Sequence, residues 1–136
     1  MPSISIDELA EALKELTYEH GIFFRRITEL TELLREDSSK ATEEFIKFME
    51  NAVFPHLARE ETHVFPVISK LKPNKKPLIE ELIEEHRRLE KYYKPLQDSR
   101  GGNVENIVKE ILQSIKDHGE KEEPLYQLLL KEATKK

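Results

Sequence analysis

The chain has 136 residues, of which 38% are hydrophobic and 36% charged, and its formal net charge is -5. This length is enough for one domain with a buried core. Positive and negative residues are mixed along the sequence, which argues against nucleic acid and anionic membrane surfaces as partners. The chain contains no cysteine, so disulfides, thiol catalysis and thiolate-bound metals are excluded. The N-terminus lacks the apolar core of a signal peptide and no stretch reaches the ~20 apolar residues of a membrane span, so we expect a cytoplasmic protein.

The first predicted helix covers residues 5–36, and Ser5 and Glu8 form a predicted capping box at its start. Apolar residues recur along it at alternating steps of four and three, which indicates one buried stripe. The predicted stripe contains Leu9, Leu13, Leu16, His20, Phe23, Ile27, Leu30 and Leu34. A histidine therefore occupies a position where leucine or isoleucine would be the default.

The second predicted helix covers residues 38–71, with Asp37, Ser38 and Ser39 available to cap its start. Its predicted inner face contains Phe45, Met49, Val53, His56, Glu60, either Val64 or His63, and Val67. A turn over residues 72–77 ends this helix, and Pro77 suits the first position of the next one.

The third predicted helix runs to about Arg100, and the fourth begins after Gly101, Gly102 and Asn103. The inner face of the third contains Ile79, Leu82, His86, either Leu89 or Glu90, Tyr93 and Leu96. That of the fourth contains Val104, Val108, Ile111, Ile115, His118, Glu122, Leu125 and Leu129. Short connections force neighbouring helices antiparallel, so we expect an all-α fold, an up-down-up-down antiparallel four-helix bundle that forms a single domain over residues 1–136.

Four prolines fall inside these predicted helices: Pro55, Pro66, Pro95 and Pro124. A proline inside a helix removes one hydrogen bond and clashes with the preceding turn. Either the helices are shorter than predicted, or they are kinked near a site that holds the backbone by other means. We favour kinks, because each proline lies within a turn or two of a histidine–glutamate pair.

The inner faces carry four of the five histidines, one in each helix: His20, His56, His86 and His118. Counted from the predicted turns, their heights along the bundle agree within about two helical turns. Three of them have a glutamate four residues later, in the pairs His56/Glu60, His86/Glu90 and His118/Glu122. This spacing places both side chains of a pair on one face of the helix.

One histidine on an apolar face is usually a core residue satisfied by hydrogen bonds, and one glutamate is usually solvated. Four histidines and several carboxylates in a single layer are different, because burying unpaired carboxylates is costly. A metal ion removes this cost by binding neutral imidazoles and ionised carboxylates. The sequence therefore predicts a metal site with nitrogen and oxygen ligands inside the bundle.

The segments around these residues resemble the hemerythrin-like, or HHE cation-binding, family. The resemblance covers nearly the whole chain and rests on Glu19-His20 and on the segments 56–66, 84–90 and 118–126. The second and fourth of these segments both read His-x-x-x-Glu-Glu, with an aromatic residue and a proline soon after. The resemblance implies a non-haem di-iron centre, two iron ions with a bridging oxo or hydroxo group, which binds oxygen reversibly in the oxygen carriers. Related domains serve as iron or oxygen sensors.

Carried over by position, the resemblance implies one histidine pair for each iron ion and two bridging glutamates: His20 with His56, His86 with His118, and Glu60 with Glu122. The oxygen carriers place the fourth-helix carboxylate five residues after its histidine, so Glu123 is the alternative to Glu122 as a bridge.

The third helix departs from the oxygen carriers, which have a second histidine at the position of Glu90. We expect Glu90 to point inward and bind the same ion as His86, with Leu89 as the competing inward residue. If Glu90 is a ligand, one coordination position stays open for a small diatomic molecule, and otherwise two stay open. A carboxylate in place of imidazole also favours the more oxidised metal, and hence oxidation or sensing over reversible carriage.

His63 lies one turn after Glu60, in the Glu-x-x-His spacing of ferritin-like di-iron proteins. Those proteins need this motif twice, and the sequence has no second copy. We therefore expect His63 at the edge of the site, with metal ligation as the alternative.

Two classes of function are consistent with these residues. The first is a protein that binds oxygen or nitric oxide, or acts as an iron or oxygen sensor or store. The second is a di-iron oxidoreductase that activates oxygen or peroxide. A purely structural bundle ranks third. Zinc or manganese could occupy the same nitrogen and oxygen ligands.

Overall fold

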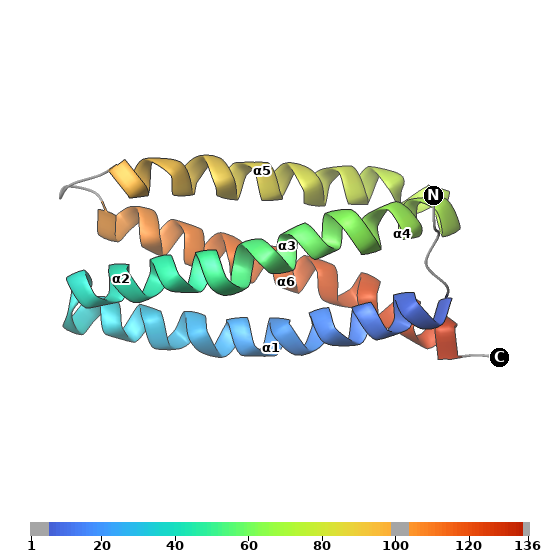
Figure 1. Cartoon of the computed structure of the whole chain (residues 1–136), viewed down its shortest axis with the longest axis horizontal. Helices are drawn as coiled ribbons and strands as arrows, with labels where there is room; N and C mark the ends of the chain where they lie inside the picture. The colour runs from blue at the N-terminus through green and yellow to red at the C-terminus, as the bar shows by residue number, and fades with distance from the viewer. Residues whose placement is uncertain (1–5, 99–103, 135–136) are drawn as a thin grey trace.

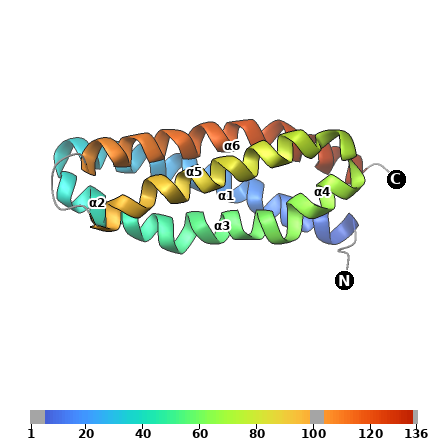
Figure 2. The same ribbon diagram turned by 90° about the horizontal axis from the view of Figure 1, so that it is seen from above.

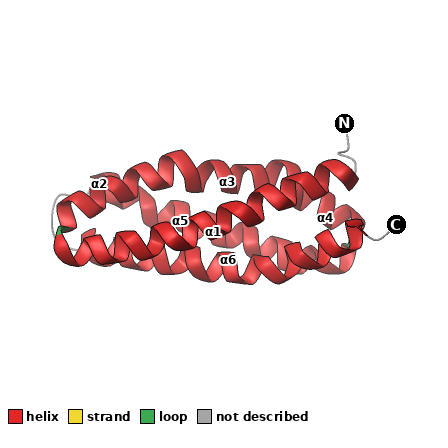
Figure 3. Ribbon diagram, turned by 90° about the horizontal axis from the view of Figure 1, so that it is seen from below, coloured by secondary structure: helices red, strands yellow, loops and turns green. Residues whose placement is uncertain are grey.

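The computed structural model describes residues 6–98 and 104–134, which are almost entirely helical and contain no strand (Figure 3). In chain order the elements are α1 (Ile6–Glu36), α2 (Ser38–Phe48), the π-helical turn η1 (Met49–Val53), α3 (Phe54–Arg59), the π-helical turn η2 (Glu60–Val64), α4 (Phe65–Leu71), the 3₁₀ turn η3 (Pro73–Lys75), α5 (Lys76–Asp98) and α6 (Val104–Thr134). None of the described helices combines the length and the apolar character that a membrane crossing needs.

Four helical rods lie lengthwise side by side to form a bundle: α1, the continuous segment from α2 to α4, α5, and α6 (Figures 1 and 2). Asp37 alone separates α1 from α2, and its carboxylate accepts a hydrogen bond of 3.1 Å from the backbone N–H of Lys40. Of the three predicted capping residues, Asp37 is therefore the N-cap. The predicted cap at Ser5 and the predicted turn at residues 101–103 lie outside the described part of the chain.

The second rod is a helix interrupted by two wider turns. The residue after each of η1 and η2 donates its backbone N–H to the carbonyl five positions earlier. Pro55 follows η1 and Pro66 follows η2, each at the second position of the next α-helical segment. A regular α-helix would press each proline ring against the carbonyl four residues back, and a π turn relieves that contact. Pro95 and Pro124 likewise lie within α5 and α6, so the helices continue through all four prolines.

A polar layer divides the apolar core into two clusters, one around Phe45 and the other around Phe65. In α1, for example, Leu16 belongs to the second cluster and Phe23 to the first, with His20 between them. The buried polar residues of this layer are His20, His56, Glu60, His86, His118 and Glu122. Because every helical rod contributes to the layer, it is a site assembled by the whole bundle.

Candidate metal centre

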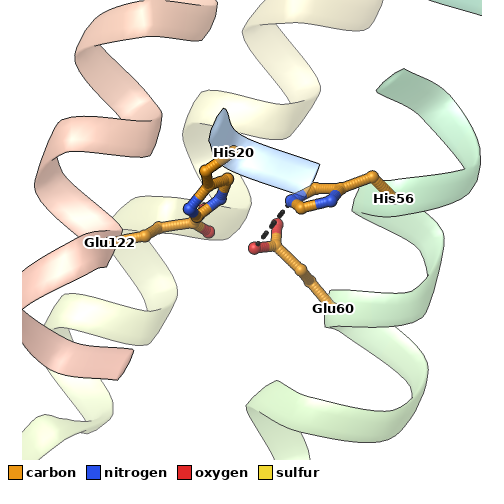
Figure 4. Close-up of side chains that lie close together, drawn as sticks. All are labelled: His20, His56, Glu60 and Glu122. Carbon is orange, nitrogen blue, oxygen red and sulfur yellow. Dashed lines mark hydrogen bonds and ion pairs between the residues drawn. The ribbon is translucent and has the colours of Figure 1, made fainter. Parts of the chain in front are cut away.

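The six residues of the polar layer form two overlapping groups. One group contains His20, His56, Glu60 and Glu122, and the other contains Glu60, His86, His118 and Glu122. In each group, one nitrogen or oxygen atom per residue lies within 4.8 Å of the others. Figure 4 shows the first group, with the imidazoles and carboxylates pointing toward one another. Glu60 and Glu122 belong to both groups, and we call them the shared carboxylates.

The two oxygens of each shared carboxylate face opposite groups. Glu122 Oε1 lies 3.0 Å from His20 Nε2, and its Oε2 lies 3.0 Å from His118 Nε2. Glu60 Oε2 lies 3.4 Å from His56 Nε2, and its Oε1 lies 3.1 Å from His86 Nε2. Each of the four histidines of the layer therefore turns Nε2 toward its interior, where a carboxylate oxygen lies close.

The other ring nitrogen of each histidine contacts a second glutamate, at the edge of the layer. The Nδ1–oxygen distances are 2.6 Å for His20 and Glu123, 2.7 Å for His56 and Glu19, 2.7 Å for His86 and Glu61, and 2.6 Å for His118 and Glu85. An ionised carboxylate only accepts, so each Nδ1–H donates, and the neutral imidazole then keeps a lone pair on Nε2. We call Glu19, Glu61, Glu85 and Glu123 the outer carboxylates.

The outer carboxylates join the helical rods into a closed ring. Glu19 of α1 accepts from His56 of α3, and Glu61 of η2 accepts from His86 of α5. Glu85 of α5 accepts from His118 of α6, and Glu123 of α6 accepts from His20 of α1. The first three of them also contact a basic side chain, namely Arg59, Arg87 and Lys121 respectively. Histidines that bind metal commonly donate their second N–H to a carboxylate, which fixes the ring orientation.

Electrostatics link the outer carboxylates to the histidines. The hydrogen bond from His118, supported by Lys121, lowers the pKa of Glu85 to about 2 against the opposing effect of burial. Burial opposes protonation of His118 as well, but contacts with Glu122, Glu60 and Glu85 raise its pKa to about 12. Burial also opposes protonation of His56, but its hydrogen bonds with Glu19 and Glu60 raise its pKa to about 9. Without a metal, protons on these histidines therefore offset the buried negative charge.

The two shared carboxylates differ in their titration. Burial alone would raise the pKa of Glu60, but its three histidine neighbours hold it well below the usual range. Burial and the charge of Glu60 together raise the pKa of Glu122. Two fully buried carboxylates this close repel each other, and positive charge between them removes the repulsion.

Two features of the layer fit a bound cation. Glu60 Oε1 is buried and has no hydrogen-bond donor of acceptable geometry among the described residues, although His86 Nε2 lies close. The Nε2 atoms of His86 and His118 face each other at 2.9 Å, while both Nδ1 atoms are engaged by outer carboxylates. When both imidazoles are neutral, these two Nε2 atoms oppose their lone pairs, which is as costly in a dry interior as the unsatisfied oxygen. Metal ions take such atoms as ligands.

Tyr126 is a buried neighbour of the shared carboxylates to which the sequence patterns assigned no role. Its hydroxyl donates to Glu60 Oε2 and lies 3.3 Å from Glu122 Oε2. Its ring stacks on His20 with a centroid distance of 5.8 Å and an interplanar angle of 5°. Burial and the two carboxylates raise the pKa of Tyr126 well above its usual value, so it remains a donor.

The prediction that Glu90 points inward is wrong. Its side chain is 51% exposed and pairs with Arg87, whereas Leu89 is only 2% exposed. The buried stripe of α5 advances from His86 to Leu89 and then to Tyr93, in steps of three and four. Glu90 is one residue past that stripe, about 100° around the helix, and faces solvent.

The two alternative ligands also lie outside the six. His63 is exposed in a groove beside α1 that contains Glu15 and Arg59. Glu123 contacts His20 Nδ1 at the edge of the layer, and Glu122 takes the shared position.

The sequence contains a signal for the outer carboxylates that the spacing of histidine–glutamate pairs does not capture. Each is adjacent to a residue of the polar layer, in the pairs Glu19-His20, Glu60-Glu61, Glu85-His86 and Glu122-Glu123. Adjacent residues in a helix point about 100° apart, so the second member of each pair faces a neighbouring helix.

Comparisons with known proteins agree with this geometry. Neither a search of curated proteins nor a search of solved structures gave a significant match. A family model, described as the hemerythrin HHE cation binding domain, matches residues 11–130 and so spans every residue of the polar layer. The chain therefore belongs to the hemerythrin HHE cation-binding family.

Proposed function

We propose that the protein holds two iron ions in the polar layer and binds a small diatomic molecule, oxygen or nitric oxide, beside them. The observation that carries this proposal is the pair of overlapping buried donor groups that share Glu60 and Glu122. His20 and His56 would complete one group, and His86 and His118 the other. The frame we propose is a single up-down-up-down antiparallel domain, in which each rod supplies one histidine.

The space beside the histidines supports a ligand of small size. A cavity of about 10 Å³ borders His20, His56, His118 and Glu122, and its other walls are mainly apolar: Phe23, Val53, Leu57, Leu89 and Ile115. This volume admits about one water-sized molecule. We call it the inner cavity. An apolar space of this size suits a small uncharged ligand and excludes an organic substrate.

Each part of the chain has a defined task in this proposal. The outer carboxylates orient the imidazoles with Nε2 inward, and the Tyr126 hydroxyl donates a hydrogen bond to Glu60. The apolar walls keep bulk water away from the site. Iron held there would supply open coordination positions and one-electron redox chemistry.

Metal content tests the proposal. We expect about two iron ions per chain after anaerobic reconstitution, as the two donor groups require. His56→Ala should reduce this content, because it removes a buried donor, whereas His63→Ala should leave it unchanged, because His63 is exposed outside the layer. A chain that retains no transition metal would contradict the proposal.

Exposure of the reduced, iron-loaded protein to oxygen tests the ligand-binding part. A stable and reversible change in the absorption spectrum would support binding. Rapid, irreversible conversion to the oxidised form would instead support the alternative class, an oxidoreductase that activates oxygen or peroxide.

A further inference from the structure

A surface groove lies against the same wall of the site as the inner cavity. It has a volume of about 640 Å³ and runs between the α3–η2 segment and α5. Phe54, Leu57 and Ala58 line it on one side and Tyr93 on the other, while Glu61, Arg87, Glu90 and Lys94 supply charged groups. We call it the α3–α5 groove. Leu57 lines both this groove and the inner cavity.

The Leu57 side chain lies between the α3–α5 groove and the inner cavity, since it lines both. It is 6% exposed, so it reaches the surface at the groove, while its neighbour His56 is 1% exposed and belongs to the polar layer. An uncharged molecule in the groove is therefore one side chain away from the cavity beside the histidines.

Aromatic rings cover the centre on other sides. At the seam between α1 and α6, a Cβ on Gly119 would lie only 3.1 Å from Phe24 Cζ, so the ring of Phe24 closes that approach. Tyr126 stacks on His20, and Phe65 lies against His86 at a centroid distance of 5.5 Å. At Leu57 the barrier is instead an aliphatic side chain, which moves between staggered rotamers.

The local backbone also favours movement at Leu57. Leu57 belongs to α3, a segment of six residues with π turns on both sides. A π turn replaces the regular hydrogen bonds of the helix, so α3 is less firmly tied to its own rod than the long helices α1 and α6 are.

We infer that Leu57 is the gate through which a small uncharged ligand passes between the α3–α5 groove and the inner cavity. The side chain excludes bulk water and hydrated ions when closed, and its rotation admits a diatomic molecule. Leu57 thereby selects ligands by size and charge and sets their rate of entry. This inference rests on the proposed function.

Stopped-flow mixing of nitric oxide with the anaerobic iron(II)-loaded protein measures the rate of entry. We expect the association rate constant to rise about tenfold or more in Leu57→Ala, to rise less in Leu57→Val, and to fall in Leu57→Phe, because gating sets the rate. Dissociation should change in the same direction, so the equilibrium constant should change less than either rate.

A second readout does not depend on ligand chemistry. In protein loaded with manganese(II), faster exchange of water into the inner cavity increases the relaxation rate of solvent protons. Leu57→Ala should increase this relaxation and Leu57→Phe should decrease it.

Leu112→Ala is the matched control for lost packing. Leu112 is 2% exposed in the same apolar cluster as Leu57 but lines neither the groove nor the inner cavity. Leu112→Ala should lower the free energy of unfolding without raising the association rate constant of nitric oxide. Equal rates in the wild type and the Leu57 variants, or equal acceleration in Leu112→Ala, would overturn the gate and leave the proposed function intact. A wild-type protein that takes up no metal or no nitric oxide would overturn both.

Discussion

Each histidine of the centre contacts a carboxylate through each ring nitrogen. For His118 these are Glu85 at Nδ1 and Glu122 at Nε2, while Glu60 lies farther from Nε2, at 3.8 Å. The first is half-buried at the edge of the layer and the second is fully buried within it. Removing an outer carboxylate therefore leaves the proposed metal ligands in place, and a charge-matched control then separates orientation from charge.

Glu85→Gln should weaken metal binding by about 10- to 100-fold, because a neutral amide holds the His118 ring less firmly. Competition with a chelator of known affinity measures the change. Glu81→Gln is the control, since Glu81 contacts the same Lys121 and is exposed at the surface. Equal losses in the two variants would show that the charge of this patch, and not the orientation of His118, supports the site.

Glu90 gives a prediction of no effect, because its side chain lies outside the polar layer. Glu90→Ala should leave the metal content and the midpoint of thermal unfolding nearly unchanged, because an exposed pair with Arg87 contributes little. His86→Ala, four residues earlier on α5, should reduce the metal content. Loss of metal in Glu90→Ala would show that α5 rotates when the site is filled.

At the scale of secondary structure, the π turns explain why the end of one predicted inner face differs from the structure. The predicted face of residues 38–71 ended in either Val64 or His63, and then Val67. In the structure Val64 and Ile68 are buried, His63 is exposed and Val67 is only half-buried. A π turn contains one more residue than an α turn, so the stripe advances by one position after η2. A regular helical period cannot anticipate this shift.

The N-terminus of α2 gives a prediction for a single element. Asp37→Ala should lower the free energy of unfolding by about 1 kcal/mol, because the hydrogen bond to the backbone N–H of Lys40 is lost. Urea denaturation of the metal-free protein measures this. Asp37→Asn keeps an acceptor and should retain most of the stability, so an equal loss in both variants would contradict the role as a cap.

At the scale of the whole molecule, the buried histidines link stability to pH. The pKa of His56 is about 9 in the folded metal-free protein and 6.5 in the reference state, and that of His118 is about 12. The stabilising protonation is fully present below pH 6.5 and is lost as the pH rises through the folded pKa values. The stability of the metal-free protein should therefore fall between pH 6.5 and 9, by about 1.4 kcal/mol per pH unit for each proton that only the folded protein retains.

Urea denaturation across this pH range measures the decline. Metal binding displaces these protons, so protein loaded with metal should show a weaker decline or a rise with pH, and metal uptake should release protons at neutral pH. A metal-free protein whose stability is constant or rises from pH 6.5 to 9 would show that the folded protein does not hold protons on His56 and His118.

Sequence patterns by themselves predicted the family, the helical character and five of the six residues of the polar layer, namely the four histidines and Glu60. The reason is local: in a regular helix, spacing decides which face a residue occupies, and a histidine within an apolar stripe is buried with it. This is why every residue predicted for the stripe of α1, including His20, is buried. The identity of the metal, the ligand and the cytoplasmic location stay predictions.

Tertiary structure alone decided which of two adjacent residues enters the site. Leu89 rather than Glu90 is buried, and Glu122 rather than Glu123 is shared between the donor groups. Adjacent residues differ by about 100° in direction, and the positions of the neighbouring helices determine which direction leads inward. Tertiary structure also decided that the outer carboxylates contact the histidines and that Leu57 lies between the α3–α5 groove and the inner cavity. Both features depend on contacts between rods, which the spacing of residues within one helix does not encode.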